Sequence, residues 1–110
     1  MFKKKNAKVL NVGGRLVECC TVKGLADILG KSRDTVSRYE ALDYFPLAPL
    51  HVGSYRYYPI TLAYKLKPIV AKFPINKPPG AELLVEVNKI FNEERNILCQ
   101  QERNPQQQAQ

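Results

Sequence analysis

Hydrogen-bond donors and cations crowd the stretch Ser32–Glu40, whose sequence is SRDTVSRYE. A helix that inserts into the major groove of DNA must be polar on its outer face, because base edges and phosphates are hydrogen-bonding surfaces. Its inner face needs only a few apolar anchors, for which this region offers Val36, Tyr39 and Leu42. The pattern therefore predicts a DNA-recognition helix with Ser32, Arg33, Thr35, Ser37 and Arg38 facing outward.

The charged residues of this helix allow different roles. Arg33 and Arg38 can each fork onto a guanine, or hold a phosphate and so position the protein without reading the base sequence. Asp34 lies in the first turn, where the helix dipole favours a carboxylate. We interpret Glu40 as the intramolecular partner of a nearby basic side chain rather than as a DNA contact.

Two short helices are expected to position this surface. Thr21 is a suitable N-cap for the amphipathic segment VKGLADIL, and Gly30 falls where a left-handed residue would end that helix. Ser32 is the expected N-cap of the second helix, which is predicted to run to about Leu42. Two short helices joined through Gly30 and Lys31 form a helix-turn-helix.

A β-hairpin is predicted on each side of the helix pair. AKVLNV and RLVECC flank Gly13-Gly14, which is a signal for a primed turn. Pro46 and Pro49 prevent a regular helix farther along the chain. There LHV and YRYY flank Gly53-Ser54 and favour β-structure, so we expect the second hairpin to be a small wing.

The C-terminal part is expected to be helical. Apolar side chains recur at helical spacing from Ile60, and Pro68 either kinks this helix or begins a new one. Residues 74–80, PINKPPG, are predicted to form a stiff linker. Residues 81–101 predict an amphipathic helix for oligomerisation or partner binding, and Glu94 interrupts its apolar seam. The members of this seam are Leu83, Leu84, Val87, Ile90, Phe91, Ile97 and Leu98. Residues 102–110 are Gln-rich and predicted to be disordered.

The positive charge is concentrated in the first part of the chain. The formal net charge is +7, and residues 1–80 hold 14 Lys and Arg against 5 Asp and Glu, whereas residues 81–110 hold 3 against 5. A segregated positive field favours a polyanionic partner such as nucleic acid, although such charge also serves ordinary solvation. Residues 1–20 combine the first hairpin with a basic arm that would lie along the DNA backbone or in the minor groove, or else remain solvated. The cations of the arm are Lys3, Lys4, Lys5 and Lys8.

Several classes of protein are disfavoured. Three cysteines, two of them adjacent at Cys19-Cys20, make a poor disulfide framework and indicate a reducing cytoplasm. No Cys and His spacing predicts a metal site, and no nucleophile motif or phosphate-binding glycine loop predicts an enzyme or a cofactor. No apolar run is long enough to span a membrane, and residues 1–14 lack the apolar centre of a secretory signal. We therefore expect a cytoplasmic protein, associated with the nucleoid or, if phage-encoded, located in the host cytoplasm.

Residues 20–70 resemble the MerR family and the related excisionase-like winged helix-turn-helix proteins. TVKGLADILGKSRDTVSRYEALDYFP is similar to the first two helices of that family, and SYRYY at residues 54–58 is similar to its Gly-Tyr-Arg-X-Tyr wing signature, with Ser54 in place of glycine. The resemblance implies a fold that is mainly α with a small β component, with the winged helix-turn-helix in residues 21–73 and a C-terminal amphipathic helix. It also implies a phosphate contact for Arg56. The DNA-contacting residues predicted from these features together are Lys23, Lys31, Ser32, Arg33, Thr35, Ser37, Arg38, Tyr55, Arg56 and Tyr57.

The leading hypothesis is a sequence-specific protein that binds double-stranded DNA, either a transcription regulator or a recombination-type architectural factor. It would act as a homodimer or higher homo-oligomer, because one such small domain covers only a short half-site. Two alternatives remain open. One is a phage-type packaging or recognition subunit that oligomerises through residues 81–101. The other is a protein-interaction adaptor that binds its partner through residues 81–101 and uses the helix-turn-helix only as a scaffold.

Overall fold

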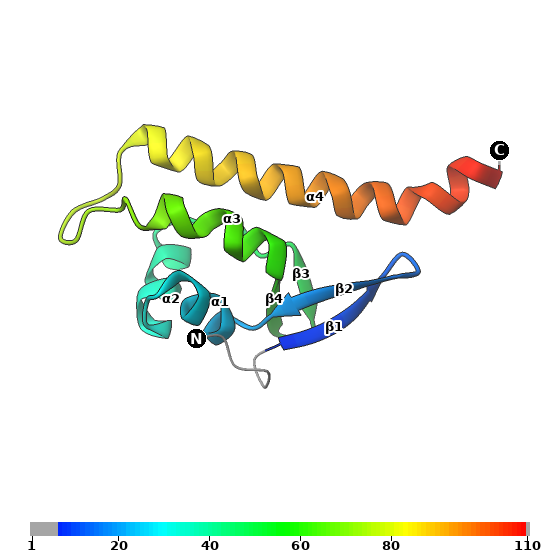
Figure 1. Cartoon of the computed structure of the whole chain (residues 1–110), viewed down its shortest axis with the longest axis horizontal. Coiled ribbons are helices and arrows are strands. Elements are labelled where there is room, and N and C mark those ends of the chain that lie inside the picture. The colour runs from blue at the N-terminus through cyan, green and yellow to red at the C-terminus, as the bar shows by residue number, and fades with distance from the viewer. Residues whose placement is uncertain (1–6, 110) are drawn as a thin grey trace.

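The computed structural model describes the backbone of residues 7–109 and the side chains of residues 7–98 (Figure 1). The elements in chain order are β1 (Ala7–Val12), β2 (Arg15–Cys20), α1 (Val22–Leu29), α2 (Arg33–Ala41), β3 (Leu50–Val52), β4 (Tyr55–Pro59), α3 (Ile60–Val70) and α4 (Ala81–Ala109). The long helix α4 lies along α3, and α1 packs against α3 from the other side (Figure 1). The predicted arm residues Lys3, Lys4 and Lys5 lie outside the described residues.

The predicted fold class, mainly α with a small β component, is wrong. The chain is an α+β protein with a four-stranded antiparallel sheet in the order β1-β2-β4-β3. The two predicted hairpins join into this one sheet where β2 pairs with β4, with Cys19 opposite Pro59 and Cys20 opposite Tyr58. Local sequence patterns predict each hairpin by itself, but pairing between segments so far apart along the chain leaves no periodic signal. The sheet is therefore larger than the resemblance implies.

The predicted turn at Gly13-Gly14 is confirmed. Gly13 has a φ of 59° and Gly14 a φ of 88°, as a type I′ turn requires, and Val12 pairs with Arg15 across it. The side-chain oxygen of Asn11 accepts a hydrogen bond from the Gly14 backbone at 3.0 Å. Two adjacent glycines are needed here, because each central residue of this turn has positive φ.

The predicted ends of the two short helices are also confirmed. Thr21 Oγ1 accepts from the Gly24 N–H at 3.1 Å and caps α1, which Gly30 ends with a left-handed φ of 73°. Ser32 Oγ accepts from the Thr35 N–H at 3.1 Å and caps α2. The predicted end of α2 near Leu42 also holds, since the helix runs to Ala41 and Leu42 is its C-cap. The prediction that Leu42 belongs to the buried stripe was wrong, because its side chain is 51% exposed.

The core is closed by α4, and much of the apolar seam predicted for oligomerisation lies inside the chain's own core. Val87 and Phe91 are fully buried within the chain, Leu98 is buried, and Leu83 and Ile90 pack partly against the core. These side chains pack against the rest of the chain, where α4 contacts α3 and β1. The sequence could not reveal this, because an amphipathic helix shows the same period whichever surface it covers. The helix continues to Ala109 through most of the tail predicted to be disordered, where the glutamines favour helix although Pro105 opposes it.

A buried polar contact explains why Glu94 interrupts the seam. Its side chain is almost completely buried, and one carboxylate oxygen accepts from Thr61 Oγ1 at 2.6 Å. The other oxygen lies 2.8 Å from Lys65 Nζ. Both partners come from α3, so this acidic residue fixes the register of α4 on α3 instead of marking the end of the buried face.

Cys19 and Cys20 are free thiols buried in the core. Burial raises the pKa of Cys19 to about 11 and the pKa of Cys20 to about 12, the latter with a further contribution from Cys19. Both groups therefore stay protonated near neutral pH and act as small apolar side chains.

Candidate nucleic-acid interface

The structure divides most of the predicted DNA-contacting residues between two sides of α2. Arg33 lies on one side with Lys23, Tyr55 and Arg56, and these residues line one cavity. Lys31, Thr35 and Arg38 line another cavity. Thr35 and Arg38 point about 140–160° away from Arg33 around the helix axis, at 3.6 residues per turn. The predicted set is therefore two surfaces rather than one.

The first of these surfaces is a cavity of about 410 Å³ between α1, the start of α2 and the β3–β4 turn. We call it the hairpin cavity, and its lining residues are Thr21, Val22, Lys23, Arg33, Ser54, Tyr55 and Arg56. Lys23 comes from α1, Arg33 from α2 and Arg56 from β4. In the described part of the chain no Asp or Glu lines this cavity. Three cations with nearby hydroxyl groups form a surface suited to an anion such as phosphate.

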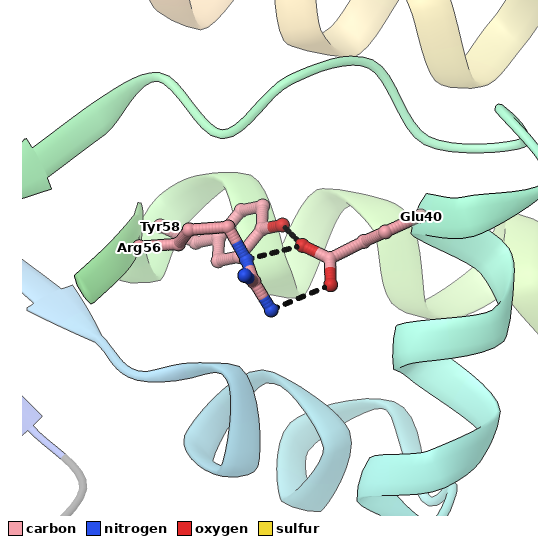
Figure 2. A network of polar contacts seen from close by, with 3 residues as sticks. All are labelled: Glu40, Arg56 and Tyr58. Carbon is pink, nitrogen blue, oxygen red and sulfur yellow. Dashed lines mark hydrogen bonds and ion pairs between the residues drawn. The ribbon is translucent and has the colours of Figure 1, made fainter. Parts of the chain in front are cut away.

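A polar network ties α2 to β4 beside this cavity (Figure 2). Arg56 donates to both carboxylate oxygens of Glu40, from Nε at 3.1 Å and from a terminal nitrogen at 3.0 Å. Tyr58 also donates its hydroxyl to Glu40. The prediction that Glu40 pairs with a basic side chain of its own chain is confirmed. The pair leaves the second terminal nitrogen of Arg56 for a ligand, and the Arg56 side chain is 41% exposed.

Burial of Tyr58 keeps its hydroxyl a donor in this network. The ring is fully buried and packs edge-on against Phe91 at 6.2 Å between centroids. Burial, and then the Glu40 carboxylate, raise the pKa of the Tyr58 phenol far above its usual value. The hydroxyl therefore donates to Glu40 at any pH at which the protein would function. Helix α2 and the β3–β4 hairpin are thus held together through one carboxylate.

The remaining predicted contacts have other surroundings. Ser32 Oγ is occupied by the cap and by a 2.8 Å hydrogen bond to Thr35 Oγ1. Ser37 lines a separate cavity that also contains Glu40 and Arg56. Tyr55 is 70% exposed, whereas Tyr57 is buried and lies beneath the ammonium group of Lys8 at 5.5 Å from its ring centroid. Tyr57 and Lys8 therefore stabilise the sheet by a cation–π contact rather than offering an open DNA surface.

Arg33 and Arg38, the two arginines predicted to face DNA, lie at the surface of the protein. Both are exposed, and neither forms an ion pair with another residue in the described part of the chain. Sequence reasoning missed Thr21 and Ser54 as cavity residues and Tyr58 as a partner of Glu40. Thr21 carried a capping signal only, and Tyr58 meets Glu40 through a contact between distant segments, which no local pattern reveals.

Among the described residues, no group of three or more His, Cys, Asp or Glu is placed to hold a metal ion. The described helices also include none with the length and apolar character needed to cross a membrane. Comparison of the chain with protein-family models, curated proteins and solved structures found no match.

Glu40→Ala is expected to lower the free energy of unfolding by about 2–3 kcal/mol. The buried Tyr58 hydroxyl would lose its acceptor, and Arg56 would lose a two-point partner whose contribution is reduced by its partial exposure. Urea denaturation followed by far-UV circular dichroism measures the change. The control is Glu86→Ala, an exposed glutamate on α4, for which we expect a change within about 0.5 kcal/mol. Equal effects of the two substitutions would contradict the importance of the network.

Proposed function

We propose that this protein binds double-stranded DNA, with α2 as the recognition helix and the β3–β4 hairpin beside it on the duplex. The observation that carries the proposal is the hairpin cavity, where cations from three elements converge and no carboxylate is among the lining residues of the described chain. The MerR-like and excisionase-like resemblance of residues 20–70 supports the same role. The proposed class is a sequence-specific transcription regulator or recombination-type architectural factor, located with DNA in the cytoplasm.

In this proposal the hairpin cavity receives one backbone phosphate. Lys23 and Arg33 supply the charge, since Glu40 offsets much of the charge of Arg56. Arg56 contributes the N–H donors of its second terminal nitrogen, and Glu40 fixes their direction. Such a contact sets the position and register of the protein on the duplex but carries no sequence information.

Sequence would be read from the outer side of α2. Arg38 is exposed there and is long enough to reach base edges, and Ser37 lies one position before it. A two-point contact from arginine to guanine contributes about 1–3 kcal/mol of discrimination against the wrong base. Ser32 would act indirectly in this scheme, because its hydroxyl caps the helix that presents these residues.

The two alternatives that depend on α4 as a docking surface are less favoured. A packaging subunit or an adaptor would need the seam residues of α4 at an interface between molecules, yet Val87, Phe91 and Leu98 lie in the chain's own core. Assembly of two copies on a palindromic site remains a prediction, and it would require a surface other than this seam.

The test is binding of the full chain to a fluorescent duplex of random sequence, followed by selection from a random duplex pool. If two or three cations contact phosphates, we expect the log–log dependence of affinity on salt to have a slope of about −2 to −3. We also expect the selected pool to converge on one motif, and a palindrome would indicate two copies. Absence of saturable binding at low salt would reject the proposal, and steep salt dependence with an unordered pool would reject sequence specificity.

A further inference from the structure

The cavity on the other side of α2 has a different chemistry from the hairpin cavity. It has a volume of about 530 Å³ and lies between α2 and the segment that follows α3. Three of its lining residues are aromatic and pack on one another: the ring centroids of Tyr39 lie 6.0 Å from Tyr44 and 5.3 Å from Phe73. We call it the ring cavity. These packed rings give it a rigid apolar floor.

The rim of the ring cavity is basic and partly apolar. Lys31 and Arg38 stand on the α2 side, and Lys77 stands on the opposite side in the segment between α3 and α4. Leu42 and Ile75 also line it and are 51% and 88% exposed. Within the described chain no carboxylate lines the ring cavity. The exposed apolar side chains lie next to packed rings and cations, and a bound ligand would cover their apolar surface.

We propose that the ring cavity binds a small planar aromatic carboxylate. The ring of the ligand would lie against the aromatic floor and cover Leu42 and Ile75, and its carboxylate would pair with Arg38 and the neighbouring lysines. Small-molecule sites of this volume are mainly apolar and aromatic with a few charged groups that fix orientation. Arginine suits a carboxylate because its two parallel N–H groups match the two oxygens.

The residues that line the ring cavity account for both features of the ligand, its aromatic ring and its carboxylate. A neutral aromatic ligand would leave three rim cations without a counter-charge, and an inorganic anion would leave the aromatic floor and the two exposed aliphatic side chains uncovered. The hairpin cavity lacks such a cluster of packed rings, and Val22 is the one aliphatic side chain among its lining residues in the described chain. The two cavities therefore favour different ligands. Because Arg38 lines the ring cavity and is also the proposed base-reading residue, a ligand bound here and the duplex would compete for Arg38.

The test is titration of the full chain with sodium 2-naphthoate, without DNA, followed by ¹H–¹⁵N correlation spectra. We expect saturable shifts confined to residues 31–44 and 73–78, with a dissociation constant of about 0.1–1 mM for a ligand of this size. Neutral 2-acetylnaphthalene and sodium acetate at the same concentrations are expected to bind at least about fivefold more weakly. Shifts that do not saturate, that spread over the surface, or that are equal for the neutral compound would overturn the proposal.

Two matched pairs of substitutions test the site itself. Leu42→Glu places a carboxylate at the rim and is expected to weaken naphthoate binding about tenfold or more, whereas Leu42→Gln, of similar shape, changes it about twofold at most. Lys77→Ala is expected to weaken binding about threefold to tenfold, whereas Lys72→Ala, an exposed lysine outside the lining, leaves it unchanged. Equal effects within either pair would overturn the assignment. Lys23→Ala with Arg33→Ala changes the hairpin cavity and should leave naphthoate binding intact, so failure here and failure of DNA binding are distinguishable.

Discussion

Phe91→Ala is expected to lower the free energy of unfolding by about 3–5 kcal/mol, the range found for large-to-small changes at fully buried aromatic positions. Phe91 on α4 is completely buried, and its ring centroid lies 5.9 Å from that of Phe45 and 6.2 Å from that of Tyr58. The loss arises from removed apolar contacts and from the cavity left among rings that cannot collapse onto it. Urea denaturation, monitored by circular dichroism, measures the change.

The control for this prediction is Val85→Ala on the same helix, because Val85 is 64% exposed and should change stability by no more than about 0.5 kcal/mol. Phe91→Leu keeps most of the side-chain volume and provides a milder variant should the alanine protein fail to fold. If Phe91→Ala left stability unchanged but altered the sedimentation coefficient, α4 would be an assembly helix, as its sequence pattern suggests, and its assignment to the core would be wrong.

Local structure was predictable because the signals are short in range. A cap such as Thr21 or Ser32 acts within three residues, and the left-handed position of Gly30 is set by its own backbone. The turn at Gly13-Gly14 is decided by two adjacent residues. Each of these features depends only on residues close together in the chain, so sequence alone locates it.

The features that sequence could not predict are pairings between distant segments. Hydrophobic periodicity located α4 but could not show whether its apolar face covers its own core or a second molecule. In the sequence Glu94 interrupts that apolar face without a visible reason, because its partners Thr61 and Lys65 are far away in the chain. The joining of β2 to β4, which changes the fold class to α+β, is of the same kind.

The candidate site was predicted only in part for the same reason. Residue types identified Arg33, Arg38 and Arg56, and the pairing of Glu40 with a basic side chain was anticipated. The angles between α1, α2 and the hairpin decide which cations share a surface. Those angles bring Lys23 to Arg33 and place Arg38 at the ring cavity, so one predicted interface became two cavities of different chemistry.

The double substitution Lys23→Ala with Arg33→Ala is expected to weaken binding to duplex DNA by about 60-fold at 0.1 M salt. Each cation that neutralises a phosphate contributes about 0.9 to the log–log salt slope, which corresponds to a factor of about 8 between 1 M and 0.1 M salt. The magnitude of the slope should therefore fall by about 1.8, and the loss should be nearly the same for every duplex sequence, because phosphate contacts carry no base information. Fluorescence anisotropy over a range of salt concentrations measures both quantities.

The matched control is Arg15→Ala with Lys89→Ala, which removes the same charge from exposed residues outside the hairpin cavity. Its effect should be much smaller, because screening limits charges more than about 10 Å from a phosphate at this ionic strength. If both double variants lost affinity equally, binding would follow net charge alone, and the convergence of Lys23 and Arg33 on one cavity would have no role in it. A loss confined to the cavity variant would instead tie affinity to the geometry that α1, α2 and the hairpin create together, because the two proteins carry the same net charge.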